Sequence, residues 1–202
     1  MRIGLVGGCL VVLSSSAVGA WAASTNYGDL ASWEAAVSAP VTLVDFDGFA
    51  DGTEAGGMDL GPGGVVQNYQ GLASSPRIDN DSPFGGGWLT NRNNLGFDEF
   101  VNGIRIDFTT PVFAVSLTDN PNEANRLRLY DANDQIVGEM TNTTAQTFLG
   151  IVTDTPVSYM TVVNLPPEDG RFAIDDLRFA VPEPGSLALL GLGGLFLFRR
   201  RR

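Results

Sequence analysis

The chain contains no histidine and no lysine, and its only cysteine, Cys9, lies close to the N-terminus. The absence of histidine excludes Ser-His-Asp and Cys-His nucleophilic catalysis, as well as the usual histidine-containing zinc sites. If the N-terminal segment is removed on export, the mature chain has no thiol and no disulfide. Its stability must then come from core packing, alone or together with a bound metal.

Basic residues are scarce between the two ends of the chain. Residues 24–180 carry 22 acidic residues against seven arginines, which gives a net formal charge of −15. Nucleic-acid binding is disfavoured because phosphate contacts need clustered basic groups. An acidic exterior suits solubility outside the cell, and it also offers oxygen ligands to a hard cation such as calcium.

The N-terminus has the pattern of a secretory signal peptide. Arg2 is a minimal basic region, Ile3 to Leu13 is apolar, and Ala20-Trp21-Ala22 fits the small-x-small cleavage rule. We therefore expect residues 1–23 to hold the signal peptide, with cleavage after Ala22 and a mature chain that starts at Ala23. The export machinery is the partner that this segment implies.

The C-terminus carries a second short apolar run. Leu187 to Phe198 contains only Leu, Ala, Gly and Phe, and these twelve residues are fewer than the roughly 20 that a transmembrane helix needs. The four arginines that follow can snorkel, and they satisfy the positive-inside bias if the C-terminus is cytoplasmic. Pro182 and Pro184 keep the segment in front of this apolar run extended, and an extended backbone is the form that a protease binds.

Together these features resemble the PEP-CTERM sorting signal of Gram-negative bacteria. The resemblance covers residues 181–202 and rests on a Pro-Glu-Pro motif, a short hydrophobic transmembrane helix and a terminal basic cluster, with these motif residues: Val181, Pro182, Glu183, Pro184, Arg199, Arg200, Arg201 and Arg202. It implies cleavage near the Pro-Glu-Pro motif by an exosortase, a membrane cysteine protease. Such substrates are commonly associated with exopolysaccharide and biofilm matrix. An ordinary short tail anchor with a chance Pro-Glu-Pro is the alternative.

This resemblance also implies a location. The chain would be exported and held briefly in the inner membrane, with its domain on the periplasmic side. After processing, it would reach the cell surface or the extracellular matrix.

Residues 24–180 are expected to form one all-β domain with a single short helix. The helix is predicted over Asp29–Val37, because Asp29 can cap it and Leu30, Trp33 and Val37 share one face. Strands are predicted over 41–47, 65–69, 104–109, 112–118, 126–130, 136–140, 148–152, 159–163 and 172–179, with a turn at Pro111.

Many short strands separated by turns indicate an antiparallel β-sandwich of jelly-roll type. Residues 73–96 are the least regular part, where Trp88 and Leu89 would anchor the segment to the core. Short pieces such as Val44-Asp45-Phe46-Asp47 and Phe172 to Leu177 are similar to the β-sandwich ectodomain often joined to this tail.

Calcium is the one cofactor that the acidic residues suggest. The first and last strands of a jelly roll commonly lie side by side, so Asp45 and Asp47 could converge with Asp175 and Asp176. Asp79 and Asp81 form a second possible cluster. The alternative is that all of these acids are solvated strand ends and turn residues.

Three aromatic residues could stack on sugars, or instead pack in the core or at its rim: Tyr69, Trp88 and Tyr130. The main hypothesis is a non-enzymatic domain with a structural or carbohydrate-adhesive role, for which an extracellular polysaccharide is the partner. The alternative is a secreted glycan-active hydrolase, which needs two carboxylates about 5 to 10 Å apart. Its candidate glutamates share no recognisable motif: Glu34, Glu54, Glu99, Glu123, Glu139 and Glu168.

Overall fold

The computed structural model of the chain describes residues 23–61, 63–68, 76–80, 86–90, 103–119, 124–142, 147–165 and 173–181. Ten strands and one helix lie in these ranges: β1 Ser24–Tyr27, α1 Leu30–Ala36, β2 Val41–Val44, β3 Gly64–Asn68, β4 Arg77–Asp79, β5 Trp88–Thr90, β6 Gly103–Asp119, β7 Asn125–Tyr130, β8 Ile136–Thr141, β9 Phe148–Asn164 and β10 Ala173–Ala180. The expected signal peptide and sorting helix fall outside them. Within the described ranges, no helix has the length and hydrophobicity needed to cross a membrane.

The two longest strands, β6 and β9, build both layers of the fold. In their first pairing region, Ile104 to Phe108 of β6 pairs with β3 on one side, and Gly103 to Asp107 pairs with the second half of β9 on the other. In the second, Ala114 to Thr118 bonds to β10 and to the first half of β9. The register shifts between Asp107 and Val112, where the chain passes from one layer to the other.

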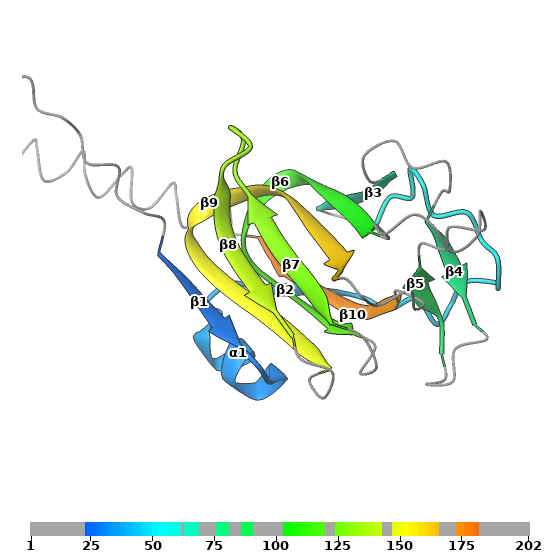
Figure 1. The fold of residues 1–202 in the computed structure, drawn as a ribbon, viewed down its shortest axis with the longest axis horizontal. Coiled ribbons are helices and arrows are strands. Elements are labelled where there is room, and N and C mark those ends of the chain that lie inside the picture. The colour runs from blue at the N-terminus through cyan, green and yellow to red at the C-terminus, as the bar shows by residue number, and fades with distance from the viewer. Residues whose placement is uncertain are drawn as a thin grey trace, which may run out of the picture.

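We call these layers the β7 layer and the β10 layer. The β7 layer consists of β3, the first half of β6, the second half of β9, β7 and β8; the β10 layer contains the other halves of β6 and β9 with β10, β1, β2, β5 and β4. Figure 1 shows β7 and β8 in front of β10 and β2. Every pairing is antiparallel, so the predicted all-β fold, an antiparallel sandwich with one short helix, is confirmed.

Two predicted strand boundaries are wrong. Residues 104–109 and 112–118 form one strand instead of two joined by a turn, and so do residues 148–152 and 159–163. Pro111 lacks a backbone N–H, but it lies where the ladder is already interrupted between Asp107 and Val112, so the strand bends and continues. The segment predicted to be irregular also contains two short strands, β4 and β5.

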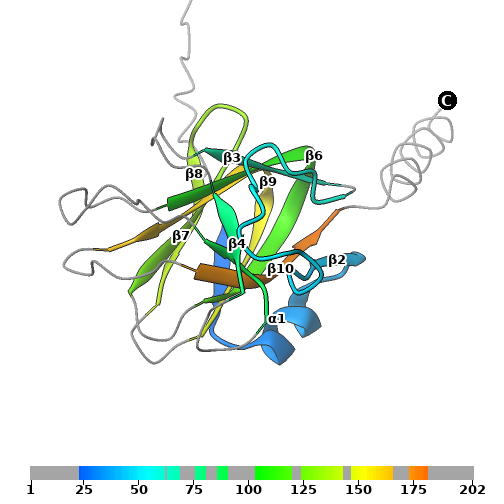
Figure 2. The same ribbon diagram turned by 90° about the vertical axis from the view of Figure 1, so that its right-hand side faces the viewer.

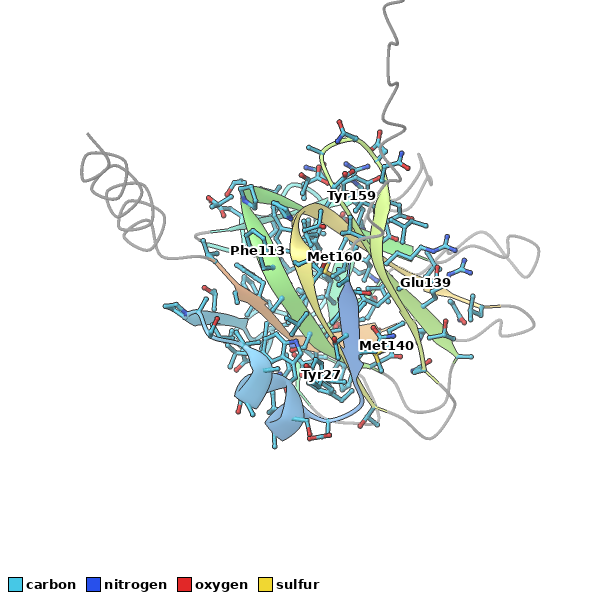
Figure 3. The ribbon with its side chains drawn as sticks, turned by 90° about the vertical axis from the view of Figure 1, so that its left-hand side faces the viewer. Tyr27, Phe113, Glu139, Met140, Tyr159 and Met160 are labelled. Carbon is cyan, nitrogen blue, oxygen red and sulfur yellow. The ribbon has the colours of Figure 1, made fainter. Side chains whose placement is uncertain are left out.

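The main core lies between the two layers. Ile104, Leu127 and Leu129 contribute to it from the β7 layer, and Leu117 and Leu149 contribute from the β10 layer, all with no exposed surface. Figure 3 shows Met160 between the layers and Glu139 on the outer side of β8. The alternation of buried and partly exposed residues along β7 therefore turns one set of side chains inward and leaves the other on the outer face.

The helix α1 covers the outer face of the β10 layer. Asp29 caps it by accepting a hydrogen bond from the Ser32 N–H at 2.9 Å, as predicted, and this bond lowers the pKa of Asp29. Trp33 is fully buried in a second cluster with Ala114, Phe148 and Ala180. In Figure 2, α1 lies below β10 and β2. In the described ranges no helix covers the outer face of the β7 layer.

Candidate functional site

The four aspartates proposed as calcium ligands lie near the paired ends of β2 and β10. These strands pair with Val44 opposite Leu177, which places Asp45 and Asp47, just beyond β2, near Asp175. The pKa of Asp175 is raised to about 6, chiefly by burial. The Asp176 backbone hydrogen bond opposes this shift, and the negative charges of Asp176, Asp47 and Asp45 add to it. The structure thus brings acids from the two strands into one electrostatic neighbourhood.

The carboxylates of this group are already engaged by nearby backbone and side chains. Asp47 accepts a hydrogen bond from the Gly87 N–H at 2.6 Å, and Asp175 accepts one from the Asp176 N–H at 2.6 Å. Asp176 has a left-handed backbone, with φ 50°, inside the bulge of β10, and its carboxylate pairs with Arg178 at 3.4 Å.

Calcium binding at these residues stays a prediction. Across the part of the chain that the structure describes, no three acidic side chains are grouped so that they could hold a metal ion. Asp79, of the second proposed cluster, is buried in β4 with 7% exposure, and Asp81 lies outside the described residues.

The three aromatic residues proposed as sugar-stacking groups have different outcomes. Trp88 is only 5% exposed, which leaves little of its ring accessible, and its sugar-stacking role stays a prediction. Its neighbour Leu89 lies in the main core, as expected. Tyr69 lies outside the described residues. Tyr130 lies in β7 on the outer face of the β7 layer, where its ring stacks on that of Tyr159 with centroids 4.5 Å apart and planes 8° apart.

The outer face of the β7 layer carries a continuous array of planar side chains, which we call the arginine–tyrosine face: Arg105, Asp107, Arg126, Arg128, Tyr130, Glu139 and Tyr159. Strand register places these residues side by side across β6, β9, β7 and β8. Tyr159 lies between Tyr130 from β7 and Arg105 from β6, whose guanidinium carbon is 3.8 Å from the Tyr159 ring centroid.

Hydrogen bonds fix the members of this face. The Tyr159 hydroxyl donates to Asp134 at 3.0 Å, and burial together with this bond raises the pKa of Tyr159 to about 12. Arg105 pairs with Asp107 at 2.6 Å, and Arg128 pairs with Glu139 at 2.5 Å, a bond that raises the pKa of Arg128.

These paired side chains remain 28% to 42% exposed, so a ligand can reach them. Tyrosine and arginine offer flat surfaces with hydrogen-bonding ends, and little conformational entropy is lost when such pre-stacked groups bind. The face therefore presents flat surfaces and fixed hydrogen-bonding groups that a polar ligand could contact.

Sequence reasoning included Tyr130 among the candidate ligand-binding residues but did not include Arg105 and Tyr159. The alternation of polar with apolar residues along 103–109 and 125–130 was the available signal, since it places Arg105, Arg126 and Arg128 outside.

The three described glutamates of the hydrolase alternative lie on different parts of the fold. Glu34 lies on α1, and the backbone of Glu54 forms an isolated β-bridge with that of Arg77. Glu139, in β8, is ion-paired with Arg128 of β7. The other three, Glu99, Glu123 and Glu168, lie outside the described residues.

The first residue of the sorting motif belongs to the folded domain. Val181 follows β10 directly and packs, partly buried, against the main core. The remaining motif residues lie outside the described part: Pro182, Glu183, Pro184, Arg199, Arg200, Arg201 and Arg202.

Comparisons with known proteins give distant structural similarities. No curated protein matches the chain. The K2 cleaved adhesin domain of Lys-gingipain is 10% identical, with a TM-score of 0.48 over 70% of this chain and 100% of that one. A family 29 carbohydrate-binding module from Piromyces equi is 14% identical, with a TM-score of 0.45 over 74% of this chain and 95% of that one. These similarities are too distant to assign a ligand.

The C-terminal segment has a direct match. Residues 180–202 match the family model of the PEP-CTERM protein-sorting motif, as the resemblance of the tail implied. The match begins at Ala180, the last residue of β10, and covers the whole tail. The chain therefore carries a PEP-CTERM sorting motif behind a β-rich domain, which indicates an exported protein that is sorted at the membrane.

Proposed function

We propose that the chain is an exported protein of the cell envelope or extracellular matrix, whose β-sandwich is a non-catalytic carbohydrate-adhesive module. Its tail holds it briefly in the inner membrane, with the domain on the periplasmic side, until an exosortase-type protease cleaves near Pro182-Glu183-Pro184. The sorting motif at residues 180–202 supports this route.

The adhesive role rests on the arginine–tyrosine face. One outer surface of the sandwich is filled by α1, whereas the other presents stacked tyrosines and ion-paired arginines to solvent. Hydrogen-bonding groups that are fixed in advance bind a polar polymer without a large loss of entropy. The Asp107 and Glu139 carboxylates of this face are each paired with an arginine, which fits a surface that holds a glycan without cleaving it.

A glycan array with the purified full-length chain in detergent tests this function. We expect retention of a subset of glycans, no release of shorter products, and binding about tenfold weaker in Tyr130→Ala, equivalent to about 1.4 kcal/mol. Phe49→Ala is the control, because Phe49 is exposed but is not part of the arginine–tyrosine face. Absence of binding to every glycan would contradict the adhesive role, and release of products would favour the carboxylate-pair hydrolase.

A further inference from the structure

The described arginines are distributed unevenly over the domain. Three of the five lie on the arginine–tyrosine face, although residues 24–180 carry a large excess of acids. The other two are Arg77 in β4 and Arg178 in β10, and Arg178 is paired with Asp176. The positive charge of the described part is therefore concentrated on the one face that no helix covers.

Arg126 differs from its two neighbours on this face. Arg105 and Arg128 each have a carboxylate partner, at Asp107 and Glu139. Arg126 has no ion-pair partner among the described residues, and its Nε is buried without a hydrogen-bond acceptor. Its cross-strand neighbours, Thr141 in β8 and Val163 in β9, are uncharged.

A guanidinium in this state lacks an anion. Two of the three guanidinium groups on the face are paired with neighbouring carboxylates, so Arg126 is the one that lacks an internal counter-charge. A partly buried cation without a counter-charge is stabilised by a ligand that supplies one. The planar fork of arginine matches a carboxylate or a sulfate group with two parallel hydrogen bonds. Because the domain as a whole is acidic, attraction of an anionic polymer has to be local, at this residue.

We propose that the arginine–tyrosine face binds an acidic polysaccharide, with Arg126 holding a carboxylate or sulfate group of the chain. Arg126, Arg128 and Tyr130 project from the same side of β7, spaced about 7 Å apart along the strand. The row from Arg126 to Tyr130 is longer than one sugar ring, so the ligand is a polymer and not a free monosaccharide. This inference rests on the proposed adhesive function and adds the class of glycan.

The test compares charged and neutral forms of the same polymer. Affinity electrophoresis of the full-length chain in detergent would use polygalacturonate, its carboxyl-reduced form, dextran sulfate and dextran. We expect at least one acidic polymer to bind about tenfold or more tightly than its neutral counterpart, and the pair that shows the difference identifies the group as carboxylate or sulfate. Arg126→Gln should remove the difference, whereas Arg77→Gln should leave it unchanged.

The variants separate the possible causes of failure. Arg126→Lys keeps the charge but not the fork, so it should retain part of the preference and replaces Arg126→Gln if that variant does not fold. Equal binding of acidic and neutral polymers would overturn the anionic inference while leaving the adhesive function intact. Equal losses in the Arg126 and Arg77 variants would point to bulk charge and also overturn it. If neither these polymers nor any array glycan bind, the adhesive function fails as well.

Discussion

The side-chain amide of Asn125 donates to both carboxylate oxygens of Asp119, at 2.8 and 2.9 Å, and neither residue has exposed surface. The amide of Asn142 also donates to Asp119, and the Asn142 carbonyl oxygen accepts from the Asn125 backbone N–H. This buried network ties the end of β6 to the start of β7 and the residue after β8. A buried hydrogen-bond network of this kind stabilises the folded state when all its polar groups have partners, and it becomes costly when one partner is removed.

Asp119→Ala should therefore lower the free energy of unfolding by about 3 kcal/mol, because two buried amides lose their acceptor. Urea denaturation measures the change. Thr141→Ala is the control, since Thr141 is exposed at the end of β8. A loss below about 1 kcal/mol would mean that water or another group replaces the carboxylate, and that the network contributes little.

Gly150 marks a close contact between β9 and α1. A Cβ at this position would lie 2.7 Å from Trp33 Cδ1 and 2.7 Å from Phe148 Cε1, and both side chains are buried. Gly150→Ala should cost about 1 to 3 kcal/mol, because a packed interior resists the added volume. Gly48→Ala is the matched control, with no atom within 4 Å of the new Cβ. Denaturation followed by tryptophan fluorescence would show the difference, and equal stability of the two variants would contradict this packing.

Local signals in the sequence predicted the helix and most of the strands, but not β1, β4 and β5, and the pairing of distant segments determined the remaining features. The Asp29 cap and the spacing of Leu30 and Trp33 belong to one helical turn, so the helix was predictable. Whether the chain reverses direction or only bends near Pro111 depends on which strands pair with the segments before and after it. Those partners, β3 and β10, lie far from Pro111 in the sequence. The same holds for the Arg105–Tyr159 contact, which joins residues on β6 and β9.

Asp175 makes the domain sensitive to pH. Its folded pKa of about 6 exceeds the ordinary value of 3.8, so its stabilising effect is present below pH 4 and is lost as the pH rises through 6. A shift of two units would correspond to about 3 kcal/mol, which solvent screening of the half-buried carboxyl reduces to about 1 kcal/mol. Asp175→Asn, which keeps an acceptor for the Asp176 N–H, should gain this amount at pH 7 and flatten the profile between pH 4 and 6.

Urea denaturation across that pH range is the measurement. Glu34→Gln is the control, since Glu34 is an exposed acid on α1. A variant less stable than the wild type at pH 7 would show that the ionised carboxylate of Asp175 is stabilising instead.

Calcium at Asp45, Asp47, Asp175 and Asp176 can be tested by thermal melting with and without a chelator. Calcium at 100 times its dissociation constant would stabilise the folded state by about 2.7 kcal/mol. The melting temperature of a domain of this size would rise by about 5 to 10 °C. The rise should disappear in Asp175→Asn, and an unchanged melt of the wild type would remove this prediction.

The junction between β10 and the tail sets a limit on processing. Ala180 is paired with Val41 in β2 and with Ala114 in β6, and Val181 packs against the core. A protease that binds its substrate in an extended form cannot bind residues of a strand whose backbone groups are already hydrogen-bonded to neighbouring strands on both sides. We therefore expect the cleaved peptide bond to follow Val181 or a later residue. Mass spectrometry of the exported protein should show a new C-terminus between residues 181 and 186.

Replacing both Pro182 and Pro184 by alanine should slow this cleavage, because the segment then no longer stays extended. Ser186→Ala is the control for a change next to the motif. An exported form that still ends at Arg202 would contradict processing altogether. A terminus before Ala180 would show that β10 unpairs before the protease acts, and the folded domain would then set no limit on the cleavage site.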